Sequence, residues 1–257
     1  MPVTKTPTPG RHKLSRRGKL IINRQPLHMQ VADSIRAMIV AGRFAGGEKV
    51  PGNELADELG VSLTPLREAL KVLAGEHLIE LTPNRGARVT PVTIDETRHL
   101  FEVLAGLEAL AAELAAARIT PTQLRRISQN HEEMRRHFET GDRAKYFDAN
   151  RRIHDLVVEY AENPILSQLR SQLSVRAERA RFLSVAVGTG RGLAMSDHEL
   201  LVEALSRGDG AEAHRVWRKH LLRSGEECCA VLRHEASQPV AGDDAQAPAP
   251  PAPDPIP

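Results

Sequence analysis

The chain has 257 residues, of which 41% are hydrophobic, and a formal net charge of +2. This length suits two domains of ordinary size. No run of residues approaches the roughly 18 to 20 consecutive apolar residues that span a bilayer, and no apolar segment follows the basic N-terminus as a secretory signal requires. We therefore expect a cytoplasmic protein with no membrane partner.

The charge is distributed unevenly along the chain. Residues 1–91 carry 14 Lys and Arg against 8 Asp and Glu, a net charge of +6, and the remainder carries 21 against 25, a net charge of −4. A basic front suits a polyanion such as DNA, because each neutralised phosphate releases counterions. An acidic back suits cations or polar ligands.

Both ends of the chain are predicted to be disordered. Residues 1–24 combine Pro, Thr, Gly and basic residues without an acidic residue, and residues 235–257 are rich in Pro and Ala. Such segments cannot offset their ordering entropy by burial. Residues 1–24, the basic arm, either make nonspecific contacts to phosphates or are a solvated tail without a function. We assign no site to this arm.

Residues 25–91 are predicted to form a winged helix-turn-helix domain. Apolar periodicity indicates helices over 27–41, 53–59 and 64–75, with a tight turn between the second and the third. Gly60 in that turn permits a positive φ. The apolar residues that the two helices share as a core are Leu55, Ala56, Leu59, Leu66, Ala69, Leu70 and Leu73.

The third helix presents a polar side that suits the major groove of DNA. We expect Thr64 to cap this helix and Pro65 to occupy its first turn. Arg67 and Lys71 lie four residues apart, and therefore on one face. The alternative is a small helical domain with ordinary surface charges.

A hairpin is predicted after the third helix. Residues 78–81 and 87–90 are strand-like, and the Pro and Gly of residues 82–86 mark the turn between them. A hairpin beside a helix-turn-helix is a wing. Arg85, next to Gly86 at its tip, is placed to reach phosphates or the minor groove.

Three runs in this region are distinctive: residues 55–70 (LADELGVSLTPLREAL), 76–79 (EHLI) and 84–89 (NRGARV). They closely resemble the winged-helix domain of the GntR family of bacterial regulators. The resemblance implies that the start of the third helix and the wing contact DNA, through Ser62, Thr64, Pro65, Arg67, Arg85 and Gly86, and we add Lys71 from its spacing. The family usually has arginine where this chain has Leu63. Leucine cannot donate two hydrogen bonds to guanine, so the bases that are read stay open.

The rest of the chain, residues 92–234, is predicted to be an all-helical domain for ligand sensing and dimerisation. The expected helices are 94–117, 121–139, 142–161, 164–184, 197–207 and 210–233. Side chains that cap helix N-termini precede most of them, namely Thr93, Thr120, Asn163, Ser196 and Asp209. The adjacent Cys228 and Cys229 are interpreted as reduced packing residues, because adjacent cysteines suit a disulfide poorly.

Three histidines and one asparagine of this domain are candidate metal ligands. Asn150 and His154 lie four residues apart on one helix face, and His198 and His220 lie on two later helices. Three imidazoles and an amide oxygen suit one cation if the bundle packs these faces together. The chain has 11 histidines, however, and scattered histidines also serve as ordinary surface or core residues.

Five features of this domain point to a known ligand domain: residues 101–108 (FEVLAGLE), 150–154 (NRRIH), 163–166 (NPIL), 197–205 (DHELLVEAL) and His220. They resemble the FCD subgroup of GntR regulators, whose ligand domain is a bundle of six or seven helices. The resemblance implies a divalent metal held by Asn150, His154, His198 and His220. Because an amide oxygen carries no charge, we expect zinc or nickel rather than magnesium.

The resemblance also implies a small organic acid as the effector. The FCD pattern often has an arginine in the first bundle helix near the ligand carboxylate, where this chain has Leu104. Arg176 or Arg179 is then the candidate to hold the carboxylate against the metal. The alternative, which is the more common role of such residues, is that both arginines are solvated helix charges.

The sequence thus predicts a mainly α protein that is a ligand-responsive transcription regulator, expected to be a repressor and not an enzyme. A homodimer would place two recognition helices on a palindromic operator in double-stranded DNA, and the effector would bind one arrangement of the dimer better. Two alternatives are a metal-dependent enzyme that uses the histidines, although no H-E-x-x-H motif is present, and a DNA-organising protein without a ligand.

Overall fold

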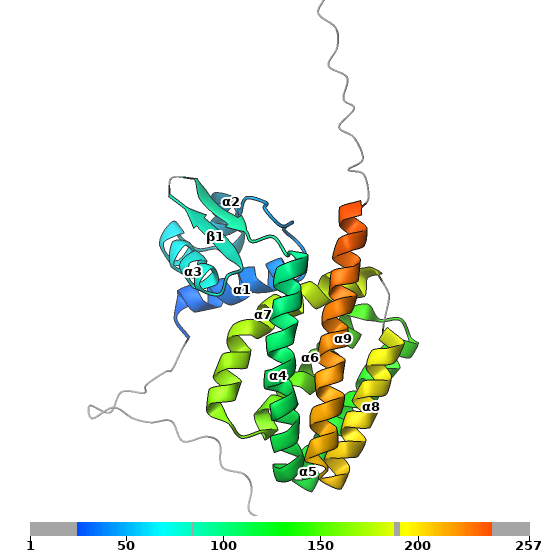
Figure 1. The fold of residues 1–257 in the computed structure, drawn as a ribbon. Coiled ribbons are helices and arrows are strands. Elements are labelled where there is room, and N and C mark those ends of the chain that lie inside the picture. The colour runs from blue at the N-terminus through cyan, green and yellow to red at the C-terminus, as the bar shows by residue number, and fades with distance from the viewer. Residues whose placement is uncertain (1–24, 84, 188–190, 238–257) are drawn as a thin grey trace, which may run out of the picture.

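The computed structural model describes residues 25–83, 85–187 and 191–237. A small N-terminal domain packs at one end of a bundle of long helices (Figure 1). The fold class is as predicted, because the described residues are mainly helical and the only strands among them form one hairpin. The predicted basic arm, residues 1–24, lies outside the described residues.

The N-terminal domain contains a helix-turn-helix and a wing. Its helices are α1 (Leu27–Val40), α2 (Gly52–Leu59) and α3 (Leu63–Gly75). Strands β1 (Ile79–Thr82) and β2 (Gly86–Val89) pair in antiparallel fashion, with Ile79 opposite Val89. Gly60 adopts φ +64°, so its positive φ in the turn between α2 and α3 is confirmed.

The start of α3 differs from the prediction. The helix begins at Leu63, and its N-cap is Ser62, which has extended backbone and makes no side-chain capping hydrogen bond. The prediction of Thr64 as the cap was therefore wrong. Pro65 is the third residue of α3, where its missing N–H costs nothing because the first backbone N–H groups of a helix have no acceptor within it.

Six helices make up the described part of the second domain. They are α4 (Ile94–Arg118), α5 (Pro121–Glu139), α6 (Arg143–Tyr160), α7 (Pro164–Val187), α8 (Arg191–Arg207) and α9 (Gly210–Ser237). Helix α4 packs most extensively against α9, and the two run side by side along the bundle (Figure 1). None of the helices among the described residues is long and apolar enough to cross a membrane.

Most of the predicted helix starts are confirmed. Side-chain oxygens of Thr93, Thr120, Asn163 and Asp209 each accept a hydrogen bond from a backbone N–H three residues later. The predicted cap at Ser196 was wrong, because α8 begins at Arg191 and Ser196 lies inside it. Helix α9 continues to Ser237, so residues 235–237 are helical rather than part of a disordered tail, and residues 238–257 lie outside the described residues.

Each domain has its own buried apolar core. One core gathers residues of α1, α2, α3 and the hairpin, such as Ile35, Leu66 and Leu73. The other gathers residues of the six bundle helices, such as Phe101, Ile153 and Trp217. Cys228 and Cys229 are buried in the bundle, as expected for packing residues.

Candidate functional site: a DNA-binding face and a buried histidine cluster

An open groove separates α3 from the wing. Its volume is about 800 Å³, and α2, α3, the hairpin and the segment before α2 all contribute to its walls. Residues 63, 67 and 71 of α3 line it at four-residue steps, which places them on one helical face. Lys49 is a further cation on the wall, held there because Val50 N–H donates to the carbonyl of Ala87 in the wing (2.9 Å).

The residues predicted to contact DNA lie on α3 and the wing. Pro65 is half-buried and the other six are exposed, namely Ser62, Thr64, Arg67, Lys71, Arg85 and Gly86. Arg67, Lys71 and Gly86 line the groove. Lys71 pairs with Glu68 on its own helix at 2.8 Å, and both side chains are more than half exposed. Such an exposed pair contributes little to stability, so a DNA phosphate can replace Glu68 at low cost.

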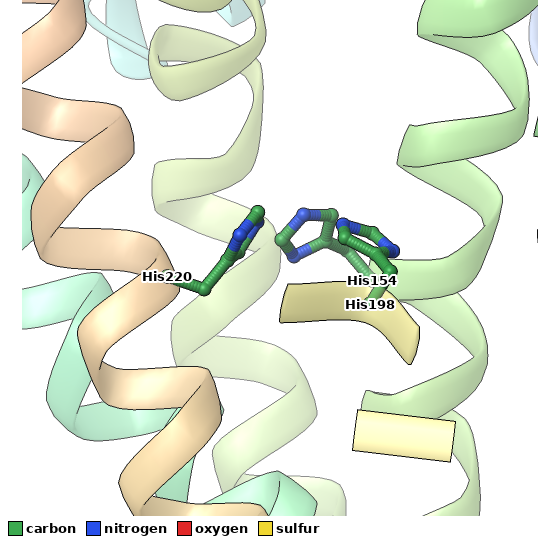
Figure 2. A group of neighbouring side chains, drawn as sticks. All are labelled: His154, His198 and His220. Carbon is green, nitrogen blue, oxygen red and sulfur yellow. The ribbon is translucent and has the colours of Figure 1, made fainter. Parts of the chain in front are cut away.

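Three histidines from three different helices meet in the bundle. His154 of α6, His198 of α8 and His220 of α9 point toward one another (Figure 2). One ring nitrogen from each lies within 4.8 Å of the others, and all three side chains are buried. A metal site requires the bundle to pack the histidine-bearing faces of its helices together, and the structure does so for these three residues.

The cluster contains buried nitrogen atoms that have no hydrogen-bond partner among the residues that the structure describes. They are Nε2 of His154, both ring nitrogens of His198 and Nδ1 of His220. Unpartnered buried polar atoms are rare and costly, and a cation would satisfy the lone pair of one nitrogen in each ring. Burial lowers the pKa of all three histidines, that of His154 to about 3. Neutral imidazole is the form that binds metals, and nitrogen donors suit zinc or nickel.

A buried carboxylate orients His154. Glu108 of α4 accepts hydrogen bonds from His154 Nδ1 (2.5 Å), Trp217 Nε1 (3.2 Å) and Arg170 Nε (3.2 Å). Burial by itself would raise the pKa of Glu108, but the interactions with His154, Arg170 and Arg181 lower it overall. Because the Nδ1–H of His154 donates to Glu108, the lone pair of its Nε2 is directed at the histidine cluster and is available to bind a cation. Metal-ligating histidines are typically held in this way.

A second carboxylate lies beside His220. The distance between Asp197 Oδ2 and His220 Nδ1 is 3.4 Å, and Arg223 forms an ion pair with the same carboxylate. Sequence reasoning missed Asp197 and Glu108 as supporting groups, although both lie inside the runs that resemble FCD domains. The signal for Glu108 was an acidic residue in an otherwise apolar helical stretch.

Two other polar residues lie near these histidines along the chain or in space. Asn150, one helical turn before His154, is half-buried, and its role as the fourth ligand stays a prediction. His131 of α5 is also buried, and its ring stacks on that of His198 at 6.4 Å between centroids. Its Nε2 has no hydrogen-bond partner in the described part of the chain. The sequence analysis did not single out His131.

Arg176 and Arg179 lie at the boundary between the two domains. Arg176 forms an ion pair with Glu96, and Arg179 Nη1 donates to the carbonyl of Thr90 at 2.5 Å. The structure thus does not bring them into the histidine cluster, and their effector-binding role stays a prediction. Another arginine of α7, Arg181, is buried, and its charge adds to the effect of burial in lowering the pKa of the three histidines.

The two domains match known families. Residues 27–89 match the bacterial regulatory proteins of the gntR family, and residues 99–223 match the FCD domain. The chain belongs to the GntR family, and it carries an FCD domain. It is accordingly a DNA-binding transcription regulator, and the resemblance read from its sequence is confirmed.

Relatives of known name are similar over most of the chain. The HTH-type transcriptional repressor RspR of Escherichia coli K12 is 26% identical over 202 residues, which cover 79% of this chain and 89% of RspR. The galactonate operon transcriptional repressor of the same strain is 26% identical over 209 residues, 73% of this chain and 90% of that protein. The structure of E. coli McbR/YncC superposes with a TM-score of 0.71 at 23% identity, covering 83% of this chain and 100% of that one. That likeness supports the fold.

Proposed function

We propose that this protein is a metal-containing repressor that releases its operator when a small organic acid binds in the bundle. The observation that carries the proposal is the exposed face of α3, where Arg67 and Lys71 line an open groove beside the wing. Cations on an exposed helix face provide both phosphate contacts and hydrogen bonds to base edges. Repressors among the similar proteins support the direction of the effect.

The histidine cluster is the proposed metal site. His154, His198 and His220 would hold zinc or nickel, and Asn150 would add an oxygen ligand. A bound cation would supply a positive centre for the carboxylate of the effector. The chain's own part is to keep the imidazoles neutral by burial and to fix the ring of His154 through Glu108. One relative acts on a galactonate operon, which supports a small organic acid as the effector class.

Helix α7 connects the proposed effector site to the DNA-binding domain. Arg170 of α7 donates to Glu108, which orients His154. Two turns further along, Arg176 and Arg179 of the same helix contact Glu96 and Thr90 at the domain boundary. A shift of α7 on effector binding would therefore move contacts of both sites. The effector acts only if it binds one of these arrangements better.

The outer face of α4 is the proposed dimer interface. Val103, Gly106 and Leu110 recur there at three- and four-residue steps and are exposed. An apolar stripe on an exposed helix is typical of a surface that pairs with a second copy. A symmetric pair would place two α3 helices on the half-sites of a palindromic operator.

The test of the proposed function is operator binding by Arg67→Ala, measured by fluorescence anisotropy. The probe is the duplex that the wild-type protein selects from a random pool. Loss of a good base contact costs about 1 to 3 kcal/mol, so we expect specific affinity to fall about 5- to 150-fold. The bundle should keep its melting temperature, because Arg67 is exposed.

The matched control is Arg125→Ala, which removes an exposed arginine of α5. It should bind the selected duplex as the wild type does. Unchanged specific affinity in Arg67→Ala would refute the assignment of α3 as the recognition helix.

A further inference from the structure

Leu63 is an apolar residue on the proposed DNA-binding face. It is the first residue of α3, its side chain is 40% exposed, and it lines the groove together with Arg67 and Lys71. The three residues follow one another at four-residue steps, so they form a single stripe along the helix. A large apolar group therefore continues a row of two cations.

Packing within the domain does not account for Leu63. The buried core of this domain is built from other residues of α3, namely Leu66, Ala69, Leu70 and Leu73, and Leu63 is neither in that core nor among the partly buried residues that pack against it. Exposing an apolar side chain to water brings no gain in stability. A contact with a binding partner would remove the side chain of Leu63 from water and so give a favourable free energy.

The major groove of DNA offers one apolar feature, the 5-methyl group of thymine. The other groups that distinguish the bases there are hydrogen-bond donors or acceptors. A leucine side chain cannot form hydrogen bonds with these donors and acceptors. If it covered them, they would lose their water without gaining a partner, which costs free energy. Against a thymine methyl, by contrast, both surfaces gain by leaving water.

We propose that Leu63 is a specificity-determining residue that contacts the methyl group of one thymine in each operator half-site. The inference rests on the proposed function, since it requires α3 to enter the major groove. Arg67, one turn later on the same stripe, then supplies hydrogen bonds to a neighbouring base or phosphate. The occupant of this part of the groove is duplex DNA, because the three cations of its walls, Lys49, Arg67 and Lys71, outnumber its one carboxylate, Glu54.

The experiment replaces thymine with deoxyuridine, which keeps the base pair and removes only the methyl group. Each thymine of the duplex selected by the wild-type protein is replaced in turn, in both half-sites, and affinity is measured by fluorescence anisotropy at fixed salt. At one symmetric position we expect the affinity to fall about fourfold per half-site. This factor corresponds to about 0.8 kcal/mol, the free energy gained by burying one carbon group. Leu63→Ala should bind the thymine and deoxyuridine duplexes equally.

Two further variants sharpen the assignment. Leu81→Ala removes the other exposed leucine of the groove wall, on the wing, and should keep the preference for thymine. Leu63→Arg should shift the preference at that position to guanine, because arginine donates two hydrogen bonds to it. The melting temperature of Leu63→Ala should equal that of the wild type, since the side chain lies outside the core.

Three results would overturn the proposal. If deoxyuridine is neutral at every position while the wild type still prefers its selected duplex, Leu63 reads no methyl group and the proposed function stands. If Leu63→Ala keeps the fourfold difference, another residue reads the methyl group. If the wild type binds selected and random duplexes equally, this inference and the proposed function both fall.

Discussion

The DNA-binding face and the histidine cluster hold their functional groups in opposite ways. Arg67 and Lys71 of α3 are exposed to solvent, and Lys71 forms an ion pair with an exposed residue of its own helix. His154 is buried and depends on Glu108, which also accepts from Trp217 and Arg170. Exposed cations are replaceable without unfolding the protein, whereas buried, mutually paired groups are not. Substitutions of the cations on α3 should therefore change DNA binding without changing stability, whereas substitutions in the histidine cluster should change function and stability together.

The largest effect should follow from removing the buried carboxylate at the centre of the bundle. Glu108→Ala leaves the Nδ1–H of His154 and the indole N–H of Trp217 without their acceptor. It also removes one of the two carboxylate partners of Arg170, which keeps its ion pair with Asp155. Breaking such a buried pair costs about 3 to 5 kcal/mol. Urea denaturation followed by circular dichroism should show this loss in the free energy of unfolding.

Glu113 on the same helix provides the control. Its pair with His214 is exposed, with 50% and 39% of the side chains accessible, so Glu113→Ala should cost less than about 1 kcal/mol. Equal losses in the two variants would contradict the contrast between buried and exposed groups.

The next largest effect concerns metal binding. Adding zinc or nickel to protein freed of metal by a chelator should raise the melting temperature, since a ligand that binds only the folded state stabilises it by about 2.7 kcal/mol at 100 times its Kd. His198→Ala should abolish the rise. His99→Ala, an exposed position of α4, should keep it. A rise that survives in His198→Ala would place the metal elsewhere.

Acid should destabilise the metal-free protein through the histidines. The pKa of His154 is lowered to about 3 by burial in the folded state, against about 6.5 in the unfolded chain. The unfolded state therefore binds the proton more readily, so the stabilisation is complete above pH 6.5 and is lost as the pH falls. At pH 5 the loss from His154 is about 2 kcal/mol.

Urea denaturation at pH 7 and pH 5, in the presence of a chelator, measures this loss. His154→Gln should lose less free energy of unfolding than the wild type over the same interval. If the two proteins respond to pH in parallel, His154 is not the group that takes up the proton.

The smallest effect should come from the wing. Arg85 is exposed there, and a phosphate contact carries no sequence information. Arg85→Ala should weaken binding to all duplexes alike and reduce the slope of log affinity against log salt by about one. Titrations at several salt concentrations test this. A selective loss on the selected duplex would show instead that Arg85 reads bases.

The N-terminal domain was predictable because its determinants are local. Gly60 marks the turn, Gly86 marks the hairpin, and the apolar spacing of α3 leaves Arg67 outside the core. The predicted helix and strand bounds differ from the observed ones by no more than one residue, and the start of α3 is one of these differences. Ser62 and Thr64 are both of residue types that are favoured as N-caps, so residue type alone did not fix the start of the helix.

The surroundings of the histidines could not be predicted in the same way. His154 pairs with Glu108 across 46 residues, and Trp217 reaches the same carboxylate across 109. Such pairs depend on how α4, α6 and α9 are rotated in the bundle, which helical periodicity does not specify. The rotation of α7 likewise places Arg176 and Arg179 at the domain boundary, where Arg179 is as buried as Arg181.

Competition between two duplexes tests the central claim, sequence-specific recognition by α3, most directly. The wild-type protein is bound to its selected duplex, labelled with a fluorophore, and displaced at about 0.15 M salt with the unlabelled selected duplex or a random duplex of equal length. We expect the random duplex to be weaker by a factor of about 10³ or more, the usual margin of specific recognition. Displacement at equal concentrations of the two competitors would contradict the account.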